Sequence, residues 1–189
     1  MNNETKNTDG GEKVEEQKKN DAGDVTAETV NITQGGARHV QATHVTLRQA
    51  GAQSVTADNL VVRQGGVVKA EVDHLEMLQG GVMLARTQTA DLTASEAGAV
   101  LCEGNVTMEQ SGAQLLLTRG DVTMDQSGAV AMMARNVRAE NSGVVFLLAR
   151  EVEGPINAAF GPRESVIFGA VAGAVAGLVM LLAKLARRK

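Results

Sequence analysis

Apolar and polar residues alternate in short runs along most of the chain, and the runs stop at glycine-containing turns. In the stretch Val61–Leu84, VVRQGGVVKAEVDHLEMLQGGVML, Leu75 and Met77 flank one polar residue. This period of two is typical of a strand with one buried face. The run breaks at the string QGG, which occurs twice in the stretch. The pattern predicts short strands joined by tight turns.

The second glycine of this string belongs to a column that recurs every 14 to 17 residues. A period this regular indicates that one supersecondary unit is stacked many times. The column contains Gly36, Gly51, Gly66, Gly81, Gly98, Gly112, Gly128 and Gly143. Two residues earlier stands Glu96 in one unit and a side-chain amide in the others, namely Gln34, Gln49, Gln64, Gln79, Gln110, Gln126 and Asn141.

A unit of about 15 residues is too short for the common helical repeats. It fits one coil of a parallel β-solenoid, so we expect an all-β rod of about nine coils over residues 21–157. With successive coils about 4.8 Å apart, the rod would be about 43 Å long. We expect the amides to hydrogen-bond up the stack as a ladder. The glycine beside each amide is expected to supply a positive φ at the corner.

Composition narrows the function classes. The chain has no Trp or Tyr and a net charge of −4, and it shows no basic stripe, so nucleic acid is not an expected partner. Carboxylates flanked by aromatic platforms, nucleophile–histidine arrangements and phosphate loops are not found, which predicts no catalytic residues, cofactor or small-molecule substrate. His44 and His74 lie two coils apart, about 10 Å, too far to share one metal ion. Cys102 is expected to be a small core residue.

The two ends of the chain differ from the repeat. Residues 1–20 are polar and mix acids with lysines, which predicts a disordered tail. Residues 158–165 are expected to form a linker, and residues 166–189 are expected to form a transmembrane helix with a basic end. Its apolar run, Val166–Ala183, has 18 residues. A soluble helix that packs over the open end of the rod is the alternative.

Two groups of residues in this last segment carry specific expectations. Glycines at four-residue spacing share one helix face and allow a second helix to approach closely. These are Gly169, Gly173 and Gly177. Basic residues after the run would lie at the membrane interface, and they are Lys184, Arg187, Arg188 and Lys189.

Orientation in the membrane stays open. The chain shows no N-terminal secretory signal, which favours a cytoplasmic solenoid. Basic residues at the extreme C-terminus instead favour a cytoplasmic C-terminus. A tail-anchored protein whose few terminal residues cross, or a shallow hairpin, would reconcile the two.

The order of a polar tail followed by a compact rod of parallel β-coils resembles the bactofilins, which are bacterial cytoskeletal polymers. The resemblance covers the architecture of residues 21–157. It implies polymerisation without nucleotide, by end-to-end stacking, in association with a membrane. The chain departs from that pattern in its amide-small-glycine corners and in its C-terminal apolar run.

Two function classes remain. The first is a membrane-anchored scaffold whose rods self-associate into a polymer or array. The second is a membrane-assembly or docking module in which the glycine-spaced helix oligomerises, even into a pore. In that case the solenoid would be a spacer or a surface for a protein partner. Neither class is an enzyme.

Overall fold

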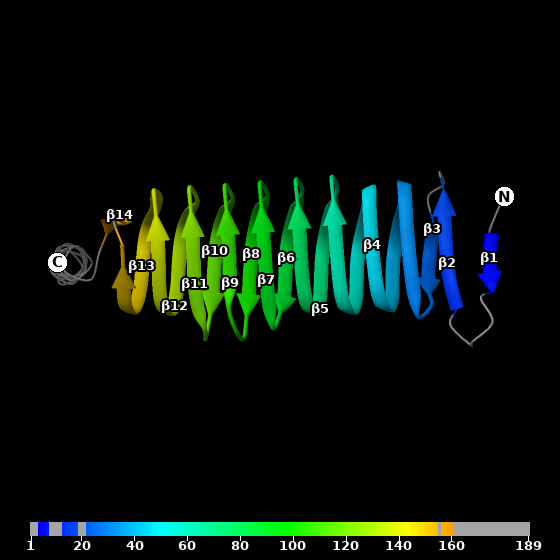
Figure 1. Ribbon diagram of the computed structural model, residues 1–189, viewed down its shortest axis with the longest axis horizontal. Coiled ribbons are helices and arrows are strands. Elements are labelled where there is room, and N and C mark those ends of the chain that lie inside the picture. The colour runs from blue at the N-terminus through cyan, green and yellow to red at the C-terminus, as the bar shows by residue number, and fades with distance from the viewer. Residues whose placement is uncertain (1–3, 8–12, 19–21, 155, 161–189) are drawn as a thin grey trace, which may run out of the picture.

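A computed structural model describes residues 4–7, 13–18, 22–154 and 156–160 of the chain. The described residues form a rod in which strands of successive coils lie side by side (Figure 1). Apart from one antiparallel pair at the N-terminus, the neighbouring strands run parallel. The predicted all-β parallel solenoid of about nine coils is therefore confirmed.

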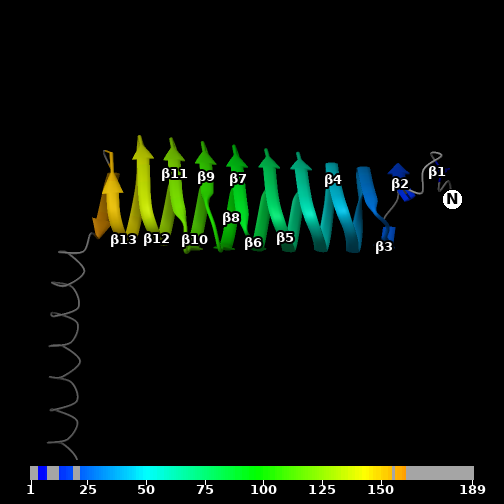
Figure 2. The same ribbon diagram turned by 60° about the horizontal axis from the view of Figure 1, so that its bottom comes forward.

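Most coils are built from more than one strand, and the longest strands continue around bends of the coil. Figure 2 shows the same stack turned about its long axis. The strands are β1 (Glu4–Asn7), β2 (Lys13–Lys18), β3 (Ala22–Thr26), β4 (Thr29–Arg63), β5 (Gly66–Leu78), β6 (Gly81–Thr87), β7 (Thr89–Thr93), β8 (Glu96–Cys102), β9 (Val106–Glu109), β10 (Gly112–Thr118), β11 (Asp121–Asp125), β12 (Gly128–Glu140), β13 (Ser142–Glu153) and β14 (Ile156–Phe160).

The burial pattern divides each coil into three short sides. In the coil that spans residues 49–63, pairs of buried residues two apart are separated by two consecutive outward residues. Because strand side chains alternate, two outward residues in succession mark a bend. We call residues 49–53 and their equivalents the glycine side, residues 54–58 the middle side, and residues 59–63 the return side.

A narrow core fills the space between the three sides. Ala and Val predominate on the glycine and middle sides, whereas the return side contributes larger side chains. The largest fully buried side chains include Leu47, Leu60, Leu75, Met77, Leu92, Met108 and Met124. A coil this narrow has room for aliphatic and thioether side chains without aromatic residues, in line with the composition.

The register corrects one column of the sequence alignment. Gly81 pairs with Glu96, and Gly112 pairs with Glu96 on the other side. Gly98 therefore does not belong to the glycine column, and the corner of that coil is Ala94-Ser95-Glu96. The string Glu96-Ala97-Gly98 imitates the amide-small-glycine pattern two residues too late. The buried Ala97, which pairs with Val82, fixes the true register.

Two coils carry one extra residue at the bend between the middle and return sides. The three-residue turns Glu103-Gly104-Asn105 and Arg119-Gly120-Asp121 lie one above the other, as the strands that follow them pair. A Cβ atom on Gly120 would come within 2.3 Å of the Gly104 carbonyl oxygen. The stacked turns thus account for both glycines.

Described strands occur at both chain ends, and β14 pairs with β13 beyond residue 157. Within the segment predicted to be disordered, β1 and β2 form an antiparallel pair, and β2 pairs parallel with β4. The helix predicted over residues 166–189 lies outside the described residues. Among the residues that the structure does describe, none form a helix of the length and apolarity needed to cross a membrane.

Candidate functional site

The amide column sits at the start of the glycine side, where the chain bends from the return side. Its residues have left-handed backbone conformation, with φ of 57° at Gln34, 50° at Gln49, 57° at Gln64, 55° at Gln79, 50° at Gln110, 49° at Gln126 and 49° at Asn141. The expectation that glycine supplies the positive φ is wrong, because the amide residue itself takes it. In the remaining coil Ala94 does so, with φ of 48°.

Four amides form a hydrogen-bonded ladder along the surface. The side-chain Nε2 of Gln34 donates to Oε1 of Gln49 at 3.3 Å. Gln49 donates to Gln64 at 3.2 Å, and Gln64 donates to Gln79 at 3.1 Å. All four side chains are exposed. The ladder ends before Ala94, whose side chain has no amide.

A buried serine ladder begins where the amide ladder stops. The Oγ of Ser111 accepts the backbone N–H of Ser95, Ser127 accepts that of Ser111, and Ser142 accepts that of Ser127, each at 3.1 Å. Each hydroxyl also donates to a carbonyl oxygen two residues earlier in the chain, for example Ser111 to Glu109 at 2.8 Å. In the preceding coils this position holds Gly35, Ala50, Gly65 or Gly80. The corner is therefore stabilised differently in the two halves of the rod.

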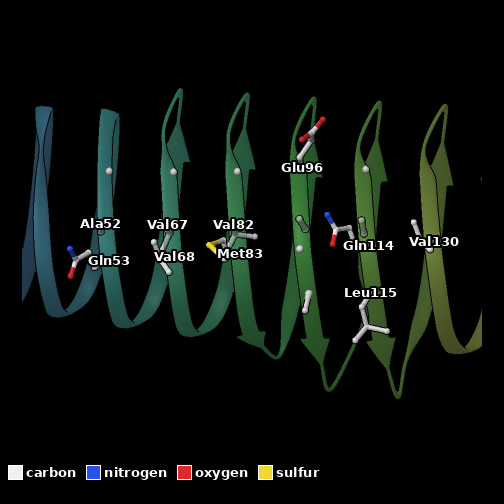
Figure 3. Close-up of a pocket in the computed structure, with 18 of the residues that line it drawn as sticks. Ala52, Gln53, Val67, Val68, Val82, Met83, Glu96, Gln114, Leu115 and Val130 are labelled. Carbon is white, nitrogen blue, oxygen red and sulfur yellow. The ribbon is translucent and has the colours of Figure 1, made fainter.

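The glycine column forms the floor of a long groove on the glycine side. The groove has a volume of about 1850 Å³ and extends from Gly23 to Gly143. Figure 3 shows Val68, Met83 and Val130 along it. A Cβ atom on Gly112 would meet nothing within 4 Å, and one on Gly81 would lie 3.6 Å from its nearest neighbour. These glycines are therefore not required by packing, and their lack of side chains is what opens the groove.

The first glycine of the QGG string has the opposite role. A Cβ atom on Gly65 would lie 2.0 Å from the carbonyl oxygen of Ala50, and one on Gly80 would lie 2.5 Å from that of Gly65. At these two positions the backbones of adjacent coils approach too closely for any side chain. At Gly65 and Gly80 the strict glycine requirement thus falls on the residue before the predicted column, a position where other coils carry Ala50 or a serine.

The middle side changes character along the rod. Near the N-terminus its outward residues are polar, and Lys69 and Glu71 form an ion pair at 2.9 Å that lowers the pKa of the Glu71 carboxyl. Near the C-terminus several large apolar side chains are exposed on this side, including Met133, Phe146 and Leu148. The sequence pattern of buried positions does not reveal this surface, because its residues occupy the outward positions.

The histidines and the cysteine take structural positions. His44 bonds to Asn59 at 3.2 Å, and His74 bonds to Thr89 at 2.6 Å. No metal-binding cluster of His, Cys, Asp and Glu occurs among the described residues. Cys102 is 5% exposed, and its thiol donates to the Gln88 carbonyl oxygen at 3.0 Å. Burial raises the pKa of this thiol.

The remaining predicted site residues lie beyond the described part of the chain. They are Gly169, Gly173, Gly177, Lys184, Arg187, Arg188 and Lys189. No protein-family model matches the chain, and no match is found among curated proteins or solved structures.

Proposed function

We propose that the protein is a membrane-anchored scaffold whose solenoid rods self-associate into a polymer or array. The observation that carries the proposal is the in-register stack itself. Gly51, Gly66 and Gly81 pair in succession, and the same column continues through Gly128 and Gly143. Each coil thus presents to the next a backbone edge of nearly the same shape.

Such an edge is a template for another coil. Strand edges carry unpaired N–H and C=O groups that another strand can satisfy. A terminal coil whose backbone edge has the same shape as that of the opposite end would accept a second rod end to end. The resemblance to bactofilins supports this mode of assembly, since their polymers imply the same stacking without nucleotide.

Membrane attachment rests on the C-terminal sequence. The run Val166–Ala183 has 18 residues without a charge and is followed by four basic residues. In water such a helix would expose a long apolar surface, at about 25 cal/mol per Å². Insertion into lipid removes that surface and satisfies the backbone within the helix.

The spacing of Gly169, Gly173 and Gly177 favours a second mode, in which the tails associate within the membrane. Electron microscopy of two chains separates the modes. If residues 21–157 alone form filaments or sheets, the rods carry the assembly. If only the full chain assembles in detergent, the tails carry it. If neither assembles at any concentration, the scaffold proposal is contradicted.

A further inference from the structure

Three successive coils near the C-terminal end repeat one outward pattern on the middle side. Each places two apolar residues and then an arginine at alternate positions, so all three point the same way. The triplets are Leu115, Leu117 and Arg119; Ala131, Met133 and Arg135; and Phe146, Leu148 and Arg150. The coil before them has Ala99, Leu101 and Glu103. We call the eight apolar residues of these four coils the apolar patch.

The patch is confined to one end of the rod. Met133 and Phe146 are each 47% exposed, and Leu148 is 59% exposed. Toward the N-terminus the equivalent residues are polar, as in Ser54, Thr56 and Asp58. Four coils at about 4.8 Å and a side of five residues at about 3.3 Å give the whole face, the arginine edge included, an area of roughly 300 Å². Exposed apolar patches of this order commonly mark interaction sites.

Charge is distributed unequally around the same coils. Arg119, Arg135 and Arg150 follow directly on the patch, at its edge with the return side, and all three are exposed. Acidic residues occupy the far end of the return side, namely Glu109, Asp125 and Glu140. In a three-sided coil that corner lies opposite the middle side. The arginines therefore border the patch. Of the other acids in these coils, Glu103 occupies the arginine column, and Asp121, Glu151 and Glu153 lie on the return side beside the arginines.

We propose that the apolar patch and its arginine edge lie on the surface of an anionic lipid bilayer. The inference rests on the membrane anchoring proposed above and names the part of the rod that touches lipid. An apolar strip bordered by cations is the pattern of segments that lie in the membrane interface. The cations bind anionic headgroups while the apolar side chains enter the acyl boundary.

The position of the tail agrees with this arrangement. β14 ends at Phe160 and pairs with β13, the strand that carries Phe146 and Leu148. The apolar run begins at Val166, only a few residues later. The anchor thus enters the membrane from the end of the rod where the patch lies. Because the N-terminal coils are polar on this side, we expect the rod to tilt and lift them away from the lipid.

A second copy of the chain fits the patch less well. In a parallel pair packed through the middle sides, the arginine edge would meet the start of the partner's middle side. The residues bordering that start are Gly98, Gln114, Val130 and Val145, none of them charged. An antiparallel pair in full overlap would place the patch against the polar N-terminal coils, and one that overlaps only at the C-terminal ends would bring the two arginine edges together. An anionic bilayer offers acyl chains to the apolar residues and negatively charged headgroups to the arginines.

The absence of Trp and Tyr from the chain allows a direct test. Met133→Trp and Leu148→Trp each introduce one fluorophore at an exposed position of the patch. Thr123→Trp places the control on the return side, also exposed. The full chain would be reconstituted in phosphatidylcholine vesicles with phosphatidylglycerol and brominated lipid. We expect the two patch variants to lose most of their emission and Thr123→Trp to keep it.

A charge series tests the arginine edge in the Met133→Trp background. Reversal of Arg119, Arg135 and Arg150 to Glu should lower the equilibrium constant for contact between the patch and anionic vesicles by about a hundredfold. The control triple R38E/R48E/R63E makes the same change in net charge away from the patch, and it should leave quenching unchanged.

Three results would overturn the inference. If the chain is membrane-bound but Met133→Trp and Leu148→Trp are not quenched, the patch does not touch lipid, although the anchoring stands. If their emission shifts to the blue without quenching and depends on protein density, a second copy covers the patch. If the full chain does not enter the vesicles, the anchoring fails and this inference with it.

Discussion

Replacing Ser111 by alanine should destabilise the rod far more than replacing Gln79 by alanine. Both side chains belong to ladders at the same corner of the coil, but the Ser111 hydroxyl is buried and the Gln79 amide is exposed. The comparison therefore isolates burial as the factor that gives a ladder hydrogen bond its value.

The magnitude follows from the bonds that each change removes. The Ser111 Oγ accepts the Ser95 N–H at 3.1 Å and donates toward the carbonyl oxygens of Glu109 and Leu92 at 2.8 and 3.0 Å. Without it a buried N–H has no partner, which costs about 1–3 kcal/mol. Gln79→Ala removes one bond whose groups can turn to water, so we expect less than about 0.5 kcal/mol.

Urea unfolding of the full chain in detergent, followed by circular dichroism, measures both changes. Circular dichroism suits a chain without Trp or Tyr. In a thermal melt of the same chains, a loss of about 2 kcal/mol corresponds to a fall in melting temperature of about 4–8 °C for a protein of this size. If the two variants unfold at the same midpoint, the buried serine ladder does not stabilise the rod and the reasoning is refuted.

Three further predictions test other positions. Gly65→Ala should prevent normal stacking, because its Cβ would lie 2.0 Å from the Ala50 carbonyl oxygen. Gly112→Ala has open space and should raise stability by about 0.4–1 kcal/mol. Equal melting temperatures for the two variants would contradict the different roles assigned to these glycines. Ala94→Gly should relieve the left-handed strain at φ of 48° and raise the melting temperature, and a fall would contradict the assigned corner. Burial raises the pKa of the Cys102 thiol and keeps the reactive thiolate scarce below that pKa, so a thiol reagent at pH 8 should modify the native chain far more slowly than the unfolded chain, and equal rates would argue against burial.

The repeat was visible in the sequence because solenoid coils impose the same demands on every unit. The spacing of Gly51, Gly66 and Gly81 predicted coils of the correct length, and the structure pairs these residues. The alignment of the repeats from the sequence went out of register at Glu96, because the corner there has neither an amide nor a glycine. Inward residues such as Ala97 and Val100 would have placed it, since burial is a stricter constraint than turn composition.

The chemistry of the corner could not be predicted from composition alone. Glycine is the usual residue at positive φ, so the pattern QGG favoured assigning that conformation to Gly66 rather than to Gln64. In the structure Gln64 has φ of 57°, and the glycine before Gly66 serves close backbone contact instead. Contact between coils depends on their separation in space, which the sequence of one coil does not show.

The apolar patch was missed for a related reason. Its residues, such as Leu117 and Met133, look like core positions in the sequence. The bend before each strand decides which residues of the alternation point inward. It turns Leu116 and Met132 into the core, where they are buried. An apolar residue becomes a surface feature here because of the bend before it.

The attachment of the rod to a membrane is most directly tested by fractionating two chains side by side. The full chain and a chain cut after Pro162 would be expressed, and the membranes would be washed with alkaline carbonate. We expect the full chain to stay with the membranes and the cut chain to be soluble after ultracentrifugation. Full-length protein in the soluble fraction would show that the C-terminal run packs on the rod, which would contradict the membrane-anchored scaffold.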